Sequence, residues 1–405
     1  MKPGKLKAIS ITPQLPSRNS ESAGGRFVRS ILDVLVDEAD LQLFAPRGGA
    51  NLRAAEDGVP YTFQLITSAQ QPSDTHRIAG MVNGKVEPIR RRLVELGATP
   101  GWGRGIFQSA SLSREIEQAD IIDLQWEEQA ALIPAIRKIN KTARIVCVFH
   151  DVLSQKFERN ANNSTSRLRW VYWTIAALRA KQLEKSIMNQ ADAVIVLSEK
   201  DGSLLPVGRA ELFVVRPEPL KFSSSTLVRK PQQGTLLFVG YLARFENEDA
   251  ITWFAEEILP KIREVFPQVS VKVAGRGIRS HVQKMADRLD IQLLDFVENL
   301  EDLYSTCSCM IVPLRHGAGV KFKVVDAISN AVPIVTTSVG AEGIFEGIES
   351  LETYDDAVSF ANEVIRKLRD QAAAEREAQA LAHSFATKQR NQAPDAAVRK
   401  AYFGG

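Results

Sequence analysis

Residues 311–344 read IVPLRHGAGVKFKVVDAISNAVPIVTTSVGAEGI, the strand, loop, helix and strand pattern of a parallel α/β sheet. The first apolar run ends at Pro313, a glycine-bracketed loop follows, and a helix is expected to start near Val320. Small residues let the backbone approach a ligand closely, and the N–H groups of a helix start favour an anion. Lys321 and Lys323 place positive charge in the first turn, where cations oppose the helix dipole. The segment therefore predicts a diphosphate site, while two solvated lysines beside a simple turn are the alternative interpretation.

The same alternation of apolar runs and amphipathic segments continues through both halves of the 405-residue chain. Apolar runs separated by helices indicate a parallel sheet that helices cover on both faces. The strands expected in the first half are KAISITP, LQLFAP, YTFQLIT, ADIIDLQW, ARIVCVFHD and ADAVIVLS. Those expected in the second half are GTLLFVGYL, SVKVAGRG, IQLLDF, CSCMIVP and PIVTTS. The predicted fold class is α/β, with two Rossmann-like doubly wound domains that face each other across a cleft.

A stretch rich in proline, serine and charge, PEPLKFSSSTLVRKPQQG, separates the two series of strands. We expect an N-terminal domain over residues 1–217, a linker over 218–233 and a C-terminal domain over 234–385. A helical segment over residues 386–405 is expected to cross back to the N-terminal domain. Because ligands bind outside the carboxyl ends of the strands in such sheets, the expected site is the cleft between the domains.

The composition argues against several classes of protein. A formal net charge of +3 is too small to indicate a nucleic-acid partner. The three cysteines, Cys147, Cys307 and Cys309, suggest neither a disulfide framework nor a zinc site. Alternation puts Cys307 and Cys309 on one face of a strand, where core packing is expected. The N-terminus does not resemble a signal peptide and no apolar run approaches the length of a membrane span, so we expect a cytoplasmic protein.

The quoted segment resembles the donor-site signature of the GT-B retaining glycosyltransferases of family 4, which include many bacterial cell-surface polysaccharide enzymes. That signature reads roughly P-L-R-x-G-x-G-x-K-x-K, then an acidic residue and Ala, and later P-V-V-x-T-x-x-G-A-E-G. Here its parts run from Pro313 to Lys323, through Asp326, and from Pro333 to Gly343. FVGYLARFENEDAITWF, VAGRG and FVENLEDLYSTC resemble further motifs of the C-terminal domain, and SAGGRFVRSIL and CVFHDV resemble the acceptor loop and the histidine strand.

The resemblance implies a nucleotide-diphosphate sugar as the donor and an acceptor that is a sugar, a lipid-linked molecule or a small molecule. His150 would lie by the transferred sugar or the acceptor, Asp151 would orient its imidazole, and Asp326 would bind the ribose. Glu342 is a weaker candidate near the donor. The catalytic set is therefore His150, Asp151 and Lys321, and the donor-binding set is Gly24, Gly25, Arg276, Arg315, Gly317, Ala318, Gly319, Val320, Lys321, Lys323 and Asp326. A structural histidine and a solvated aspartate are the alternatives for His150 and Asp326.

The chain departs from the family pattern at three places. Ala318 stands where the broad family has its first acidic residue, as in the subgroup with the G-x-G-x-K pattern. Tyr241 and Asn247 stand where many members have an Arg and a Lys that clamp the diphosphate, and Asn330-Ala331 replaces a glycine before the proline. Neutralisation of the phosphates then falls to Arg315, Lys321, Lys323 or Arg276. No Asp-x-Asp motif occurs in a suitable loop, so we expect neither a metal nor another cofactor.

The segment 167–185 combines Trp170, Tyr172 and Trp173 with five basic residues. Such a helix can rest on anionic lipid at the inner face of a membrane. Because its apolar residues spread around much of the helix, a core helix with a solvated face is the favoured interpretation.

Three hypotheses follow for the function. The first is glycosyl transfer from a nucleotide sugar, in surface polysaccharide or glycolipid assembly. The second is a GT-B-fold sugar-nucleotide epimerase, for which cleft carboxylates and histidines would be needed, and the chain has five histidines. The third is a non-catalytic nucleotide-sugar-binding protein.

Overall fold

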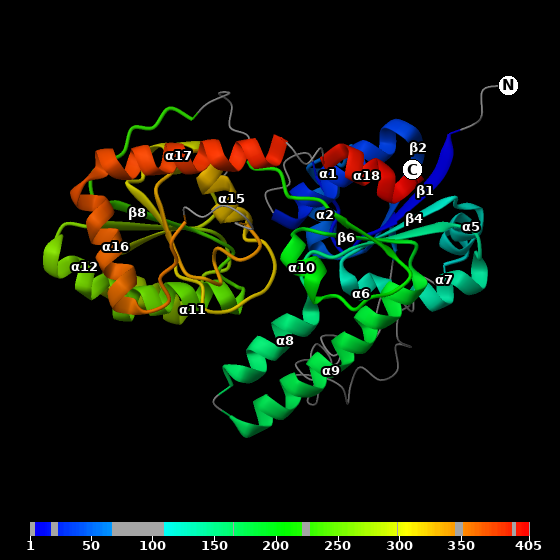
Figure 1. The fold of residues 1–405 in the computed structure, drawn as a ribbon, viewed down its shortest axis with the longest axis horizontal. Coiled ribbons are helices and arrows are strands. Elements are labelled where there is room, and N and C mark those ends of the chain that lie inside the picture. The colour runs from blue at the N-terminus through cyan, green and yellow to red at the C-terminus, as the bar shows by residue number, and fades with distance from the viewer. Residues whose placement is uncertain are drawn as a thin grey trace. The chain divides into compact units, whose positions relative to one another are not determined.

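The computed structural model describes residues 5–17, 23–66, 109–164, 166–220, 227–297, 299–344, 351–390 and 394–404. The chain forms two compact units (Figure 1). Unit 1 comprises Met1–Arg216 and Pro394–Gly405, and unit 2 comprises Pro217–Ala393. The segment that belongs to unit 1 at the C-terminal end thus starts at Pro394, whereas the sequence predicts a separate helical segment from residue 386. Part of the expected linker, residues 221–226, lies outside the described residues.

Within its described residues, unit 1 has a seven-stranded sheet in the order β3-β2-β1-β4-β5-β6-β7. All neighbouring strands are parallel. The strands are β1 (Leu6–Ile11), β2 (Ala39–Pro46), β3 (Thr62–Ile66), β4 (Ile121–Gln125), β5 (Arg144–Val148), β6 (Ala193–Val196) and β7 (Glu211–Val214). The edge strand β7 was not predicted, because it is short and only partly buried. Every residue of the central strands β4 and β6 is buried, as expected for a parallel sheet that is covered by helices on both faces.

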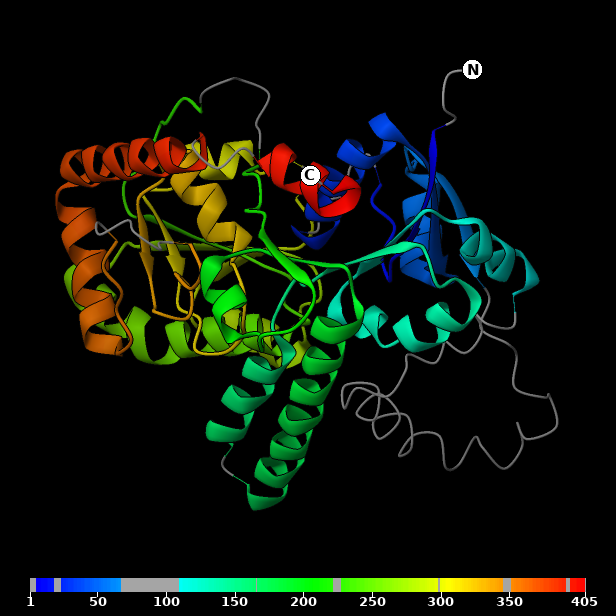
Figure 2. The ribbon, with the colours of Figure 1, turned by 45° about the vertical axis from the view of Figure 1, so that its right-hand side comes forward.

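The described residues of unit 1 form helices around this sheet. These helices are α1 (Ala23–Glu38), α2 (Gly49–Glu56), α5 (Ala110–Gln118), α6 (Glu127–Ala130), α7 (Ile133–Ile139), α8 (Leu153–Asn162), α9 (Arg167–Gln190), α10 (Glu199–Leu204) and α18 (Pro394–Phe403). The C-terminal end of α9 adds Ile187 and Met188 to the core of this sheet. The helices α8 and α9 pack on each other as a hairpin that extends away from the sheet (Figure 2). The last helix, α18, packs on α1 and on β5, β6 and β7. It buries Val398, Ala401 and Tyr402 there.

In unit 2, the described residues form a five-stranded parallel sheet in the order β10-β9-β8-β11-β12. Its strands are β8 (Thr235–Val239), β9 (Ser270–Ala274), β10 (Ile291–Leu294), β11 (Cys309–Val312) and β12 (Ile334–Thr336). Its helices are α11 (Phe245–Trp253), the π-helix η2 (Phe254–Ile258), α12 (Leu259–Val265), α13 (Ser280–Arg288), α14 (Glu301–Thr306), α15 (Phe322–Ser329), α16 (Ala357–Arg369) and α17 (Gln371–Arg390). The prediction of a parallel α/β sheet in each half is confirmed.

Two local features differ from what simple periodicity indicates. The helical stretch from Phe245 to Val265 contains the π-turn η2, just before Pro260. A proline without an N–H changes the hydrogen-bond register of a helix, and a single π-turn absorbs the change. Cys307 ends α14, while Cys309 begins β11, so the two thiols do not share a strand face. Both are buried and free, and burial raises the pKa of each thiol.

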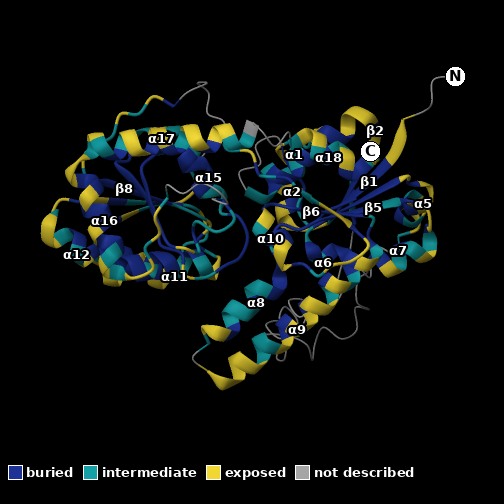
Figure 3. Cartoon of the chain, viewed as in Figure 1, coloured by how far each residue is buried: buried dark blue, intermediate teal, exposed yellow. Residues whose placement is uncertain are grey.

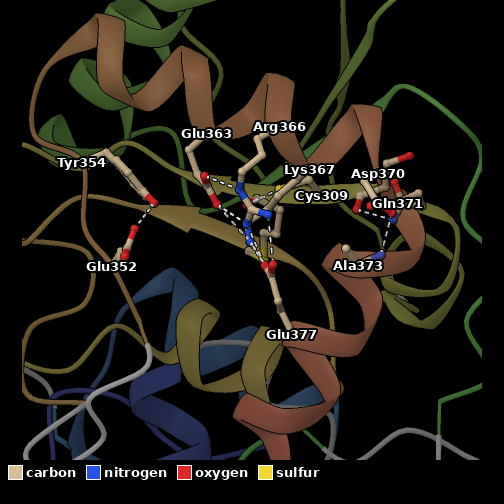
Figure 4. Close-up of polar contacts among 12 residues, drawn as sticks. Cys309, Glu352, Tyr354, Glu363, Arg366, Lys367, Asp370, Gln371, Ala373 and Glu377 are labelled. Atoms are coloured by element: carbon tan, nitrogen blue, oxygen red, sulfur yellow. Dashed lines mark hydrogen bonds and ion pairs between the residues drawn. The ribbon is translucent and has the colours of Figure 1, made fainter.

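Helices α16 and α17 are joined by a network of ion pairs (Figure 4). Arg366 donates to Glu363 at 2.8 Å and to Glu377 at 2.7 Å. Lys367, which is buried, donates to Glu377 at 3.0 Å and lies 3.2 Å from Glu363. Each charge in this network therefore faces an opposite charge, which compensates the cost of removing Lys367 from water. The network holds α17 against α16.

Helix α9 has its buried face on the α8 side and an exposed face that is partly apolar (Figure 3). The exposed face carries Leu168, Val171, Ile175 and Leu178. The sequence favours a core helix with a solvated face. The helix has both faces, and its solvated face carries these four apolar side chains. Among the helices of the described residues, none has both the length and the apolar character that crossing a lipid bilayer requires.

Candidate functional site

The glycine loop, residues 313–321, lies at the switch point of the unit 2 sheet. The first strand of this unit, β8, lies between β9 and β11, so the chain extends the sheet in both directions from β8. Ligands of doubly wound sheets bind at the carboxyl ends of the strands next to such a point. The segments that follow β8, β9 and β11 meet there, because Gly240 contacts both Gly275 and Lys323.

The glycine loop owes its shape to its two glycines and to Lys321. Gly317 has a φ of +115° and Gly319 a φ of +69°, a region that favours glycine. Lys321 Nζ donates to the carbonyl oxygens of Ala318 at 2.9 Å and Gly319 at 2.6 Å. In a trans peptide the N–H points opposite to the C=O, so the next two peptide N–H groups, those of Gly319 and Val320, point away from the ammonium. Lys321 therefore holds the loop with amides turned outward.

Helix α15 begins at Phe322, two residues after the expected start near Val320. Lys321 is consequently the N-cap residue, and only Lys323 lies in the first turn. Lys321 has the extended backbone angles usual for an N-cap residue, makes no capping bond with its side chain, and turns its ammonium back to the loop. The expectation of two lysines side by side in the first turn is therefore corrected.

Lys323 lies in a partly buried setting beneath the residues that follow β8. Its Nζ donates to Asn247 Oδ1 at 2.7 Å and lies 4.3 Å from the centre of the Phe238 ring. A Cβ atom on Gly240 would lie 2.7 Å from this ammonium and 3.0 Å from the Asn247 amide, so glycine leaves the space that both side chains occupy. Burial first, and then the charges of Lys321 and Arg244, lower the pKa of Lys323 to about 7, against the attraction of Glu246.

Asn247 links the two sides of this edge. Its amide nitrogen donates to the carbonyl oxygen of Tyr241 at 2.9 Å, and its amide oxygen accepts from Lys323. The family pattern leads one to expect a lysine at this position. Here Asn247 binds the ammonium of Lys323. The lysine side chain from α15 therefore lies beside the position at which the family pattern has a lysine.

Arg315 and His316 form a group with Asp249 from α11. Arg315 makes a bidentate ion pair with Asp249, with N–O distances of 3.0 and 2.7 Å. His316 Nε2 lies 3.6 Å from the same carboxylate. Burial lowers the pKa of His316, and Asp249 opposes this shift. Arg315, a predicted donor-binding residue, is thus anchored by a partner within unit 2.

Arg276 follows β9 on the other side of β8. Its guanidinium lies over the Phe296 ring at 3.9 Å. The preceding Gly275 has a φ of +150°, and a Cβ atom there would lie 1.9 Å from the carbonyl oxygen of Gly240. Only glycine permits this approach, which sets Arg276 close to the residues after β8.

Two predicted acidic residues have partners inside unit 2. Asp326 is 4% exposed, and its Oδ1 accepts a hydrogen bond from the backbone N–H of Leu220 at 2.7 Å. This carboxylate therefore faces the linker. Glu342 Oε2 lies 3.9 Å from Lys321 Nζ, which places this weaker candidate beside the glycine loop.

In unit 1, His150 follows β5 and meets the start of α1. Its ring stacks on Trp126 with centroids 3.8 Å apart and an interplanar angle of 4°. Phe27 meets the imidazole edge-on at 5.5 Å. A Cβ atom on Gly24 would lie 2.8 Å from the Trp126 ring and 3.8 Å from His150 Nδ1. The structure thus brings the predicted residues Gly24 and His150 together, with Gly24 and Gly25 in the first turn of α1.

Polar residues in the interior of the sheet support His150. Its Nε2 lies 3.1 Å from Gln125 Oε1, and Gln125 Nε2 donates to both oxygens of Asp123, at 3.1 and 3.0 Å. Asp123 also accepts from the hydroxyls of Ser10 and Tyr402, each at 2.6 Å. The sequence analysis did not single out Asp123, Gln125, Trp126 or Tyr402. The available signal was the polar Asp123 and Gln125 inside the apolar run ADIIDLQW.

Two buried carboxylates hold the start of α8, next to His150 in sequence. Glu127 accepts from the backbone N–H of Leu153 at 3.1 Å, and Glu184 accepts from that of Ser154 at 2.9 Å. Burial, and then the charge of Glu184, raise the pKa of Glu127 well above its usual range, and Asp151 adds to this shift. At Nε2 of His150 the hydrogen bond goes to Gln125, and the expected role of Asp151 in orienting the imidazole stays a prediction.

Comparison with known proteins gives a family match within unit 2. Residues 233–370 match the family model described as glycosyl transferases group 1. A curated relative from Klebsiella pneumoniae, described as an uncharacterized 44.6 kDa protein in a cps region, is 27% identical over 219 residues. That match covers 50% of this chain and 54% of the relative, so the chain spans about half the length of the curated relative it matches.

Solved structures with the same fold cover almost the whole chain. HepE of Anabaena, in complex with UDP and glucose, has a TM-score of 0.61 at 14% identity, covering 95% of this chain and 98% of that one. TarM of S. aureus, in a complex that includes UDP, has a TM-score of 0.64 at 11% identity, covering 98% and 99%. Sucrose-phosphate synthase of Thermosynechococcus elongatus has a TM-score of 0.61 at 13% identity, covering 96% and 98%. These likenesses show that the chain has the GT-B fold.

Proposed function

Because residues 233–370 match the family model described as glycosyl transferases group 1, we propose that this chain is a retaining glycosyltransferase that uses a nucleotide-diphosphate sugar. The observation that carries the proposal is the joining of the glycine loop, Lys321 and Lys323 at the switch point of unit 2. Solved relatives of this fold include HepE with UDP-glucose and TarM with UDP. Both complexes support a nucleotide sugar as the donor.

The donor diphosphate would bind at the outward amides of the glycine loop. Backbone N–H groups at a helix start are a favourable anion site, and the ammonium of Lys323 is close by. As the bond to the sugar breaks, negative charge grows on the leaving diphosphate. Fixed donors and cations stabilise that charge without reorganisation. Lys321 maintains the loop and adds a second positive charge, while Arg315 and Arg276 lie at the same sheet edge.

His150 would hydrogen-bond to the transferred sugar or to the acceptor hydroxyl. A transfer in which leaving group and acceptor share one face of the sugar requires that both are positioned closely. The imidazole is held by Trp126, Phe27 and Gln125, so its orientation is set before substrate binds. We assign Asp326, which faces the linker, to the ribose of the donor. Glu342, beside Lys321, stays a weaker candidate near the donor.

The acceptor is proposed to belong to cell-surface polysaccharide or glycolipid synthesis. The relative from the cps region of Klebsiella pneumoniae supports this assignment. We further propose that the chain works in the cytoplasm, at or near the inner face of the membrane.

Incubation of the purified chain with a panel of nucleotide sugars tests the proposal. Release of nucleoside diphosphate in the presence of acceptor extracts supports glycosyl transfer. Conversion of the donor to an isomer would instead identify an epimerase, and binding without turnover would identify a non-catalytic nucleotide-sugar-binding protein. Retention is read from the anomeric configuration of the product by NMR.

Activity is expected to be independent of divalent metal ions. The positive charge that the leaving diphosphate needs is available from Lys321 and Lys323, so a cation such as Mg²⁺ is not required for that role. Addition of EDTA should leave the initial rate essentially unchanged. Loss of the rate in EDTA, restored by magnesium or manganese, would contradict this prediction.

We propose that the exposed face of α9 rests on an anionic membrane. Leu168, Val171, Ile175 and Leu178 are spaced by three, four and three residues, which puts them on one side of the helix. Leu168 is 84% and Leu178 is 58% exposed. Arg167, Arg179 and Lys185 are exposed on the same helix. An apolar stripe with basic neighbours fits an anionic lipid surface.

The chain is therefore expected to bind vesicles that contain phosphatidylglycerol and to bind phosphatidylcholine vesicles weakly. Replacing Leu168 and Leu178 with glutamine should reduce binding about tenfold or more, because both side chains lose apolar area that the bilayer would bury. Leu52 is an exposed leucine on α2 and provides the matched control, Leu52→Gln. Equal binding to both vesicle types, or self-association of the chain through α9 without lipid, would contradict the proposal.

A further inference from the structure

We propose that Gln125 and Tyr402 are positioning residues for His150, which act through Asp123 and determine which imidazole nitrogen carries the proton. This inference rests on the proposed function only in its consequence for catalysis. The arrangement itself lies within unit 1. It joins the middle of the sheet, the end of β4 and the last helix of the chain, α18.

The direction of each hydrogen bond follows from the chemistry of the groups. Ser10 and Tyr402 each donate a hydroxyl hydrogen to the carboxylate of Asp123 at 2.6 Å. A carboxylate only accepts, so the amide group of Gln125 that lies 3.0 and 3.1 Å from both carboxylate oxygens must be its NH₂. The opposite orientation would place Oε1 of Gln125 against two negatively charged oxygens.

With its NH₂ group on Asp123, Gln125 presents Oε1 to His150. The Nε2 of His150 lies 3.1 Å from this oxygen, and an oxygen without hydrogen can only accept. His150 Nε2 is therefore protonated, and in the neutral imidazole Nδ1 carries the lone pair. Nδ1 lies on the side of Gly24, where the first turn of α1 begins. The imidazole is thereby oriented to accept a hydrogen bond on the side that the sequence associates with the acceptor loop.

Burial makes this arrangement specific. Ser10, Asp123 and Gln125 are fully buried within the sheet, as is Tyr402 on α18. In such an interior an unsatisfied polar group is costly, so a consistent set of donors and acceptors is strongly favoured. The Trp126 ring stacks on the face of the His150 imidazole and prevents the imidazole from tilting. Trp126 has a φ of +69°, an unusual value for a residue with a side chain.

Asp123 is the acid that controls the direction of the bonds. Burial raises the pKa of Asp123 to about 6, against the hydrogen bonds from Ser10, Tyr402 and Gln125. The other titratable groups that face it are Tyr402 on α18 and Cys147 on β5, and burial raises the pKa of both well above the ordinary value. Both stay neutral, so Asp123 supplies the negative charge. Below about pH 6 Asp123 is protonated and no longer fixes the orientation of the Gln125 amide. The hydrogen bond from Gln125 should then no longer select one tautomer of His150.

The tautomer of His150 can be measured without any enzymatic assay. The chain has five histidines, so ¹⁵N labelling of histidine gives a small set of ring signals, and the absence of one set in His150→Gln assigns it. At pH 8 the parent should show a protonated Nε2 and an unprotonated Nδ1. Asp123→Asn allows the Gln125 amide to flip, and Gln125→Met removes the acceptor. Both variants should give a mixture of the two tautomers, because nothing then fixes a hydrogen-bond acceptor at Nε2 of His150. An Asp that orients a catalytic histidine shows the same dependence when it is replaced by Asn.

Tyr402→Phe removes one hydroxyl donor from Asp123 and should shift the tautomer populations in the same direction to a smaller extent. The matched control is Tyr61→Phe, since Tyr61 is a buried tyrosine of unit 1 whose hydroxyl donates to a different carboxylate, Asp33. Where turnover can be measured, Gln125→Met should lower kcat about tenfold with the donor KM unchanged, as expected for a group that acts through another.

An unchanged Nε2-protonated ring in both Asp123→Asn and Gln125→Met, with the fold retained by circular dichroism, would overturn the inference. So would the opposite tautomer in the parent. If the parent proves inactive with every donor, the proposed function fails, while the tautomer measurement still decides the positioning of His150.

Discussion

His150→Ala is expected to lower turnover by a factor of about 10² to 10³ while the affinity for nucleoside diphosphate stays within about twofold of the parent. The imidazole is assigned to the sugar or the acceptor, whereas the groups assigned to the diphosphate are Lys321, Lys323 and the glycine loop of unit 2. A contact made in the transition state appears in kcat, and a contact made in the ground state appears in affinity. The measurement is kcat by diphosphate release together with titration calorimetry of the nucleoside diphosphate.

A purely structural histidine would give a different pattern. His150 is 8% exposed and stacks on Trp126, so its removal leaves a space in unit 1 that also costs stability. His150→Gln keeps a side chain of similar size and serves as the conservative variant, while His383→Ala, at an exposed position of α17, is the control. A parallel fall in melting temperature, affinity and turnover, or turnover equal to the parent, would contradict the assignment.

The apolar runs predicted the fold well because they report burial directly. A parallel strand covered on both faces reads as a continuous apolar stretch, as in ARIVCVFHD and ADAVIVLS, which became β5 and β6. The short edge strand β7 also carries an apolar run, Leu212 to Val215, but the strand's residues are exposed or half-buried, and the run stands directly before the expected linker. The π-turn before Pro260 and the N-cap position of Lys321 depend on local backbone geometry, which periodicity does not describe.

From local patterns the candidate site was predictable where its residues are neighbours in the sequence, and the family resemblance added distant residues such as Gly24 and His150. The glycine loop, Lys321 and Lys323 form one segment, and the structure keeps them together. The partner of Lys323, Asn247, lies 76 residues away, and Tyr402 lies 279 residues from Asp123. No local pattern links such pairs, because the sheet order and the return of α18 to unit 1 bring them together. A polar residue within a buried strand, such as Asp123, was the one sequence signal of that site.

Replacing Lys321 and Lys323 together with alanine is expected to weaken nucleoside-diphosphate binding on the order of a hundredfold. A charge-assisted hydrogen bond to phosphate contributes about 1.5–3 kcal/mol, and about 1.4 kcal/mol corresponds to a tenfold change in affinity. The two ammonium groups interact electrostatically with each other, so their effects need not add. Lys261→Ala with Lys284→Ala removes the same charge from α12 and α13 and is the matched control.

The pH dependence of the affinity separates the two lysines. Burial lowers the pKa of Lys323 to about 7, so above pH 7 the free protein holds this amine increasingly uncharged. A bound diphosphate favours the protonated amine, so binding takes up a proton and the affinity of the parent should fall as pH rises from 7.5 to 9.5. Phosphate groups are already ionised in this range, with a second pKa of about 6. Lys323→Met should bind weakly with little pH dependence. Lys321→Ala should keep a pH dependence, shifted to higher pH because the charge of Lys321 helps to lower the pKa of Lys323. An unchanged affinity in the double variant, measured by calorimetry with the fold intact, would contradict the assignment of the loop.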